Sequence, residues 1–155
     1  MSTALQTVDH SALKVNQAGI VVTVLVAFIG SFFSPVAWVL IPLLAIVLLL
    51  GTFAPQLALF KQFYFRVLKP AGIVKPRPVQ DRPEPHNFAQ GLGGVFLAVA
   101  SLFLYLAAPT YGLVAAIGPA LSLLVAVLAF VNLAFGYCLG CQIYYQLGKR
   151  GLIRA

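Results

Sequence analysis

The sequence predicts an all-α membrane protein in which four transmembrane helices form two hairpins. Composition is the first observation behind this prediction, because 61% of the 155 residues are hydrophobic and 8% are charged, with a mean hydropathy of +0.99. The distribution of charge is the second, because Lys, Arg, Asp and Glu are absent from Val15 to Phe60 and again from Pro85 to Gly148. A helix crosses a bilayer with about 20 residues, so each uncharged run can hold two crossings.

Turn-forming residues divide each uncharged run. The first run contains Gly30 and Pro35 in "GSFFSPVAW", and the second contains Pro109 and Gly112 in "AAPTYG". Glycine and proline mark turns between helices. The whole chain, 1–155, is expected to form a single transmembrane domain. Its expected partner is the lipid bilayer that surrounds it. The predicted helices cover residues 17–33, 36–58, 90–108 and 113–147.

The segment between the two hairpins, residues 69–86, is predicted to be a proline-rich loop. It contains five prolines, and proline fixes φ and removes a backbone donor. An extended, semi-rigid cytoplasmic strap is expected from this composition. A plain connector is the preferred interpretation, and a docking surface is the alternative.

The basic residues all flank the predicted spans and fall on one side of a four-crossing bundle. The positive-inside rule makes that side cytoplasmic, so both termini are expected inside. The net charge of +7 then marks a membrane boundary. No nucleic-acid partner is expected, since that function needs a solvated basic face. The basic residues are Lys14, Lys61, Arg66, Lys69, Lys75, Arg77, Arg82, Lys149, Arg150 and Arg154.

The ends of the two hairpins resemble each other. "QFYFRVLK", which starts at Gln62, and "QIYYQLGK", which starts at Gln142, share Gln, Tyr and Lys at an offset of 80 residues. Gln17 and Gln90 open the first and third predicted helices. The pattern indicates a tandem 2+2 repeat, although the match is short enough for chance to remain the alternative.

The only two cysteines form a C-x-x-C pair near the end of the fourth predicted helix. On one continuous helix, with Gly136 at 0°, Gly140 falls at about 40°, Cys141 at about 140°, Tyr145 at about 180° and Cys138 at about 200°. The glycines then form a helix-packing face, and the cysteines share the opposite face with Tyr145. Two sulfurs so placed can exchange a disulfide or pass a persulfide, or they can pack as compact apolar groups.

Amide side chains cluster at the same end of the predicted bundle: Gln17, Gln90 and Gln142. They are expected to bridge helices through hydrogen bonds. Stabilisation of a thiolate is the alternative role for them.

A structural disulfide, a metal and a cofactor are not expected. Cytoplasmic thiols stay reduced, so a disulfide at this end would be transient. A closed zinc site needs four ligands, and nothing in the spacing of His10 and His86 indicates one.

Two stretches carry a resemblance to a known family. "PHNFAQGLGGVF" and "AFVNLAFGYCLGCQIYYQLGKR" resemble the bacterial integral-membrane family of domain of unknown function 4395, and "VDHSALKVNQAGI" fits it as well. The resemblance implies a small multi-pass protein of the bacterial inner membrane without an assigned activity. It also implies an association with rhodanese-type sulfurtransferases and thioredoxin-like proteins.

Three functions stay open, and whether the protein is an enzyme stays open with them. The first is a thiol-based sulfur or redox relay in which Cys138 or Cys141 is the nucleophile, its neighbour resolves the intermediate, and Tyr145 shapes the site. The second is a non-catalytic accessory subunit of a respiratory or photosynthetic complex. The third is a transporter of a sulfur species. A quinone-coupled thiol oxidoreductase has the right size, but such enzymes usually need a second cysteine pair.

Overall fold

The computed structural model describes residues 6–106 and 113–152. Within this part of the chain, four helical segments are long and apolar enough to cross a membrane, as the sequence predicts. The turn expected at Pro109 and Gly112 and the basic residue Arg154 lie outside the described residues. The four segments are His10–Ser31, Pro35–Phe53, Pro83–Leu106 and Ala115–Phe135.

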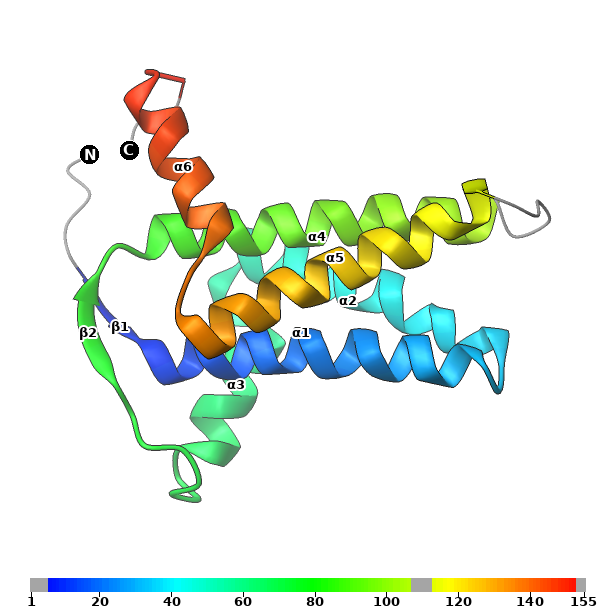
Figure 1. Ribbon diagram of the computed structural model, residues 1–155. Helices are drawn as coiled ribbons and strands as arrows, with labels where there is room; N and C mark the ends of the chain where they lie inside the picture. The colour runs from blue at the N-terminus through cyan, green and yellow to red at the C-terminus, as the bar shows by residue number, and fades with distance from the viewer. Residues whose placement is uncertain (1–5, 107–112, 153–155) are drawn as a thin grey trace.

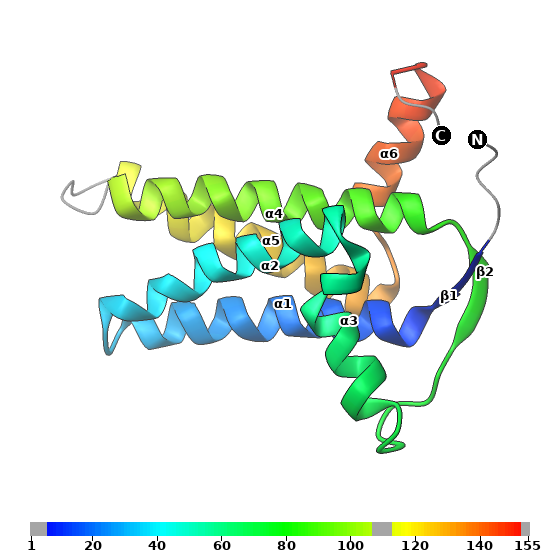
Figure 2. The ribbon, with the colours of Figure 1, turned by 180° about the vertical axis from the view of Figure 1, so that it is seen from behind.

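The long helices pack side by side around an apolar core (Figures 1 and 2). α1 (His10–Ser31) contacts α5 (Leu113–Phe135), while α2 (Leu40–Phe53), which follows the 3₁₀ turn η1 (Pro35–Val39), contacts α4 (Pro83–Leu106). Branched and small side chains from all four helices fill the interior. The buried cluster consists of Ile20, Val24, Ala27, Ile41, Leu44, Ala45, Leu48, Leu97, Ala100, Val125, Ala126 and Ala129.

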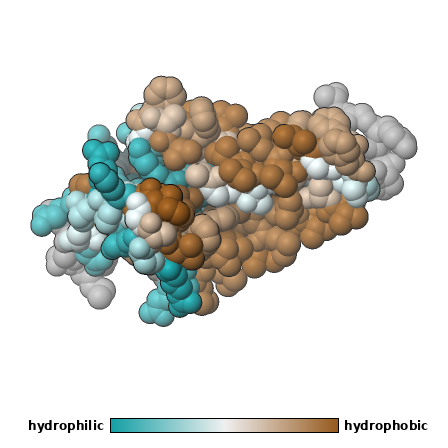
Figure 3. Space-filling model, turned by 90° about the horizontal axis from the view of Figure 1, so that it is seen from below, coloured by the Kyte–Doolittle hydropathy of each residue, from teal (hydrophilic) through white to brown (hydrophobic). Residues whose placement is uncertain are grey.

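Apolar side chains also cover the outside of the bundle, and polar side chains gather at one end of it (Figure 3). Leu102 and Phe130, for example, are 57% and 53% exposed. A contiguous apolar surface of this kind suits acyl chains rather than water. β1 (Gln6–Asp9), β2 (Pro78–Asp81) and α6 (Leu139–Lys149) all lie at the polar end (Figure 1).

Two helices begin earlier than the sequence predicts, which places a histidine in the first turn of each. α1 begins at His10 instead of residue 17, because Asp9 caps it and accepts the Ser11 N–H at 3.0 Å. α4 begins at Pro83 instead of residue 90. A proline in a first helical turn costs little, since its missing N–H would have no partner within the helix. His86 is therefore helical.

Part of the proline-rich segment 69–86 is a strand. β2 pairs antiparallel with β1, and Asp9 lies opposite Pro78 at one end of the ladder. Proline is tolerated at the first residue of a strand, where the ladder needs no donor from it. The predicted strap is thus tied to the start of α1 and brings its last residues over the polar end of the bundle.

The helices predicted over 36–58 and 113–147 are both interrupted near the polar end. α2 ends at Phe53, just before Pro55, which cannot donate a helical N–H. α5 ends at Phe135, just before Gly136, whose φ of +69° leaves the right-handed helical region. The prediction of one continuous fourth helix is therefore wrong. The elements after these interruptions are η2 (Pro55–Leu57), α3 (Leu59–Phe63), the π-helical turn η3 (Tyr64–Leu68) and α6 (Leu139–Lys149).

Candidate disulfide site at the polar end of the bundle

The interruption between α5 and α6 sets the geometry of the cysteine pair. Gly136 donates its N–H to the Asn132 carbonyl at 2.9 Å in the left-handed conformation that commonly ends helices. Cys138 then adopts an extended backbone and caps α6, with its Sγ accepting the Cys141 N–H at 3.2 Å. Both sulfurs therefore lie at a helix N-terminus, where backbone N–H groups favour negative charge.

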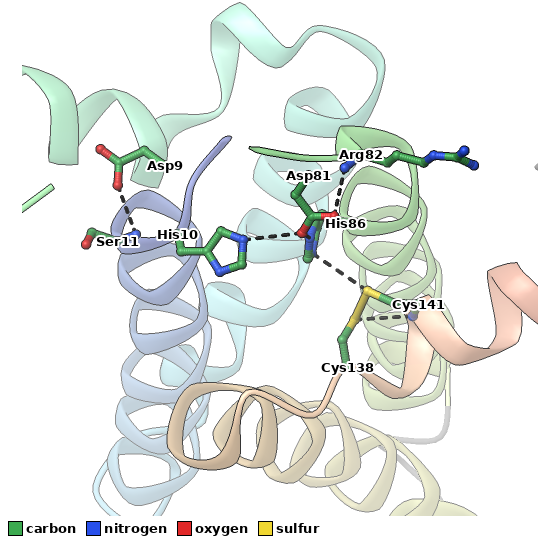
Figure 4. A network of polar contacts seen from close by, with 8 residues as sticks. All are labelled: Asp9, His10, Ser11, Asp81, Arg82, His86, Cys138 and Cys141. Atoms are coloured by element: carbon green, nitrogen blue, oxygen red, sulfur yellow. Dashed lines mark hydrogen bonds and ion pairs between the residues drawn. A yellow bond between two sulfur atoms is a disulfide. The ribbon is translucent and has the colours of Figure 1, made fainter. Parts of the chain in front are cut away.

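A disulfide joins Cys138 and Cys141, whose Cα atoms are 5.2 Å apart (Figure 4). The sequence argued against a structural disulfide here, and the structure describes the oxidised form of the pair. Because Cys138 lies outside the helix, its side chain turns back over the first turn of α6 and meets Cys141. Cys141 is 8% exposed, whereas Cys138 is half-buried. A reagent from outside therefore reaches the Cys138 sulfur more readily.

His86 connects the disulfide to a carboxylate (Figure 4). Its Nδ1 lies 3.7 Å from Cys141 Sγ, and its Nε2 lies 3.0 Å from Asp81 Oδ2. The same carboxylate oxygen lies 3.2 Å from His10 Nε2. Side chains from α6, α4, β2 and α1 thus form one chain of polar contacts that ends on a sulfur.

The Asp81 carboxylate favours one tautomer of a neutral His86. The hydrogen bond from His86 holds the pKa of Asp81 below its usual value, against the opposing effect of burial, and the Arg82 N–H adds to the lowering. Asp81 is therefore an ionised acceptor. A neutral imidazole that donates Nε2–H to this acceptor has its lone pair on Nδ1, the atom that faces Cys141.

The strand that carries Asp81 is fixed to the start of α1 by a second carboxylate. Asp9 Oδ1 accepts the N–H groups of Ser11 and Arg77, each at 3.0 Å, and Asp9 Oδ2 accepts the Tyr64 hydroxyl at 2.9 Å. The Tyr64 side chain is fully buried. These contacts, together with the two-stranded sheet, define where Asp81 lies relative to the helices.

The two glycines assigned to helix packing have separate positions. Gly136 lies between α5 and α6, so it does not share a helix face with Gly140, and the predicted opposition of glycine and cysteine faces does not apply. A Cβ built on Gly140 would lie 2.5 Å from Ala89 Cβ and 2.8 Å from Ala89 Cα. Gly140 therefore permits close approach of α6 to α4, the helix that carries His86.

Of the three glutamines predicted to lie near the cysteines, Gln17 and Gln90 line a cavity together with Cys138, whereas Gln142 does not line it. Gln90 is buried and donates to the Leu48 carbonyl at 3.1 Å, which is a helix-bridging bond between α4 and α2. Gln17 lines a cavity of about 80 Å³ together with Gln90 and Cys138. Gln142, by contrast, is exposed on α6.

Tyr145 is 41% exposed. Its neighbour Tyr144 packs against Phe88 of α4, with ring centroids 5.5 Å apart. An aromatic contact between α6 and α4 near the site is therefore made by Tyr144, the residue before Tyr145.

Two overlapping groups of side chains have donor atoms close enough to hold a metal ion. One is His86, Cys138 and Cys141, and the other is His10, Asp81 and His86. In each group the donor atoms lie within 4.8 Å of one another. The sequence indicated no metal site because these residues are far apart along the chain, and only the fold brings them together.

The roles of His86 and Asp81 beside the sulfur were missed in the sequence. Their signal was weak: His86 is one of two histidines and lies in the motif "PHNFAQ", and Asp81 is one of three acidic residues. The sequence analysis assigned residues 69–86 to a loop. A loop gives no fixed position to its side chains, so no contact of His86 or Asp81 with a cysteine could be predicted.

The comparisons with the curated proteins and with the solved structures found no match. A comparison with protein families matches residues 8–149 to the domain of unknown function DUF4395. This match extends from β1 through all the long helices to the last residue of α6. The chain therefore belongs to the DUF4395 family.

Proposed function

We propose that this protein is a thiol-based redox or sulfur relay at the polar end of a membrane-embedded bundle. The observation that carries the proposal is the line of contacts from Cys141 Sγ through His86 to Asp81, beside a disulfide at a helix N-terminus. A cysteine that only fills space needs no imidazole beside it and no carboxylate behind that imidazole. Thiol exchange needs both a stabilised thiolate and a proton acceptor.

The different exposure of the two cysteines supports separate roles for them. In the reducing direction, a thiolate from a partner attacks the more accessible Cys138 Sγ, a mixed disulfide forms there, and Cys141 leaves as a thiolate. In the oxidising direction, Cys141 attacks the mixed disulfide on Cys138, the internal disulfide re-forms, and the partner leaves as a thiolate. His86 Nδ1 accepts the Cys141 proton in this second direction. The reducing direction is completed when a second thiolate of the partner attacks the partner sulfur of the mixed disulfide, which releases Cys138 as a thiolate and leaves the partner as a disulfide. The oxidising direction starts when the Cys138 thiolate attacks a partner disulfide and one partner sulfur leaves as a thiolate. Each full reaction then transfers two electrons between the pair and the partner.

The partner is proposed to be a thiol-bearing protein on the cytoplasmic side of the bacterial inner membrane. The basic residues of the described chain lie near the start of α1, on α3 and η3, between η3 and α4, or at the end of α6, and none lies in the middle of a long helix. This distribution supports an N-in/C-in orientation by the positive-inside rule. Rhodanese-type and thioredoxin-like proteins have the appropriate chemistry, because both act through a reactive cysteine.

A tandem repeat is proposed for the fold that carries this site. In each half, a strand precedes two long helices and a shorter helical segment. The residues that precede the shorter segments, Ala58 and Cys138, both have extended backbones and are 80 positions apart. The packing of α1 on α5 and of α2 on α4 supports the same relation between the halves.

The order of sulfur chemistry can be tested with a chromogenic aromatic disulfide on the reduced, detergent-solubilised protein. We expect the wild type to release two thionitrobenzoates per chain and to retain none, because Cys141 expels the first adduct. Cys141→Ser should release one and retain one on Cys138. Cys138→Ser should react far more slowly, since Cys141 is buried.

Mass spectrometry of the products decides the outcome. Retention of two labels by the wild type would mean that the cysteines react as independent thiols. Equal rates for the two single variants would contradict the assigned roles.

A further inference from the structure

We propose that reduction of the disulfide creates a binding site for a zinc-class divalent cation, with Cys138 Sγ, Cys141 Sγ and His86 Nδ1 as its ligands. Sulfur and imidazole nitrogen are the donors that zinc prefers in proteins. These three donor atoms come from the α5–α6 connection, α6 and α4, and they lie within 4.8 Å of one another. The proposed metal site thus connects α6 and the residue before it to the first turn of α4.

The separation between sulfur and nitrogen fits tetrahedral coordination. Zinc–sulfur bonds of about 2.3 Å and zinc–nitrogen bonds of about 2.0 Å, at a tetrahedral angle, put the two donor atoms about 3.6 Å apart. The separation between Cys141 Sγ and His86 Nδ1 is 3.7 Å. On reduction, Cys138 Sγ has to move away from Cys141 Sγ to a similar distance. Its backbone lies outside the helix, so rotation of the side chain can supply this movement.

The second ring nitrogen of His86 has the partner that a metal-binding histidine requires. Its Nε2 lies 3.0 Å from Asp81 Oδ2. Histidine ligands typically donate their other N–H to a carboxylate, which fixes the tautomer and makes the coordinating nitrogen a stronger donor. A neutral His86 that donates Nε2–H to Asp81 presents its Nδ1 lone pair toward the sulfurs.

A fourth coordination position is available to water. A cavity of about 80 Å³ is lined by Cys138, His86 and His10, among other residues. A single water needs a cavity of only about 10–15 Å³. Three protein ligands with one open position are characteristic of reactive zinc sites rather than of closed structural ones.

Metal binding and disulfide formation exclude each other at this site. The cation binds thiolates and displaces a proton from each protonated thiol, while oxidation removes both thiolates by joining the sulfurs. The inference does not depend on the relay, because a reduced pair that never exchanges with a partner would still bind metal. Conversely, if the cysteine pair exchanges disulfides with a partner but does not bind the cation, the proposed relay still stands and only the metal site is refuted.

The test is a titration of the reduced protein with Cd²⁺, which gives an ultraviolet charge-transfer band when thiolates bind it, followed by competition with Zn²⁺. We expect one cation per chain. Asp81→Asn should weaken binding about 10–100-fold by removing the acceptor behind His86, and His86→Gln should weaken it at least as much. His10→Gln is the matched control, because His10 contacts the same Asp81 oxygen but not a sulfur, and it should weaken binding much less than His86→Gln does.

Three results would overturn the inference. The first is absence of the band in the reduced wild type, with circular dichroism showing an intact helical fold. The second is unchanged affinity in His86→Gln, which would indicate a two-thiolate chelate without the histidine. The third is cation binding that survives Cys138→Ser and Cys141→Ser but is lost in His10→Gln, which would assign the site to His10, Asp81 and His86.

Discussion

At the scale of single residues, His86 and His10 allow a controlled comparison. Both imidazoles reach Asp81 Oδ2, at 3.0 and 3.2 Å, but only His86 also contacts a sulfur. Any effect that depends on the carboxylate alone should be shared by the two histidines. An effect on thiol chemistry should belong to His86 only.

His86→Gln is expected to slow the second step of the reaction with the aromatic disulfide, in which Cys141 attacks the adduct on Cys138. Loss of a positioned proton acceptor costs on the order of 10²-fold in rate. Stopped-flow absorbance in the presence of a metal chelator measures the second release of thionitrobenzoate and keeps metal binding out of the result.

His10→Gln provides the control for this experiment and should leave the rate of the second step nearly unchanged. Equal slowing by both variants would show that the histidines support the local structure instead of the chemistry. Unchanged rates in both would remove His86 from the mechanism.

Cys138 and Cys141 could be recognised as a candidate site from the sequence, because a C-x-x-C spacing is itself a known pattern for paired thiols. His86 could not be assigned to it. Its contact with Cys141 spans 55 positions in the chain and depends on an early start of α4. That start is set by Pro83 and Pro85, which read equally well as parts of a loop.

At the scale of elements, the short helix α6 decides whether the sulfurs meet the histidine. It approaches α4 through Gly140, whose missing side chain leaves room for Ala89. Phe88 and Tyr144 complete the contact between the two helices. The position of Cys141 relative to His86 therefore follows from a helix-packing distance.

Gly140→Val should push α6 away from α4. Inserting methyl groups into a well-packed contact typically costs about 1–3 kcal/mol of unfolding free energy. We expect thermal unfolding in detergent to show this loss, together with slower re-formation of the internal disulfide.

The matched control is Gln146→Val, which introduces the same side chain at an exposed position of α6. It should change both measurements little. If Gln146→Val and Gly140→Val behave alike, the introduction of a valine into α6, and not the contact of Gly140 with Ala89, explains the effect.

The elements also show where pattern reasoning succeeds and where it fails. Uncharged runs and turn residues predicted the long helices, because crossing a bilayer requires a length that the sequence displays directly. The end of α5 was missed because Gly136 was interpreted as half of a packing motif together with Gly140. In the structure Gly136 instead adopts the left-handed conformation that ends a helix, and this conformation determines the geometry of the cysteines.

At the scale of the whole molecule, both cysteines, His86 and Asp81 lie in the second half of the proposed repeat. At an offset of 80 residues, Ala58 and Lys61 stand where the second half has Cys138 and Cys141. Lys61 donates to Asn87 at 3.4 Å, and its burial lowers the pKa of its ammonium group. The corresponding place in the first half is thus a polar contact between helices with no sulfur in it.

The overall bundle places the candidate site at its polar end, apart from the apolar faces of the long helices (Figures 1 and 3). The apolar faces of the long helices suit the bilayer, while the sheet, α6 and the chain of polar contacts lie together at the polar end (Figures 3 and 4). Composition and charge predicted this separation of apolar and polar regions. They could not predict the two-stranded sheet, because the pairing of β1 with β2 joins segments more than 60 residues apart by backbone hydrogen bonds, which leave little trace in side-chain pattern.

An equilibrium redox titration of the purified protein is the most direct test of a reversible cysteine pair. The protein would be equilibrated without oxygen in dithiothreitol or glutathione buffers of graded potential, and free thiols would be alkylated with a reagent that shifts mobility on a gel. We predict that both cysteines become protected together, in one two-electron transition with a slope of about 30 mV per tenfold change in ratio. Independent alkylation of Cys138 and Cys141, or a pair that stays oxidised in every buffer, would contradict the proposed relay.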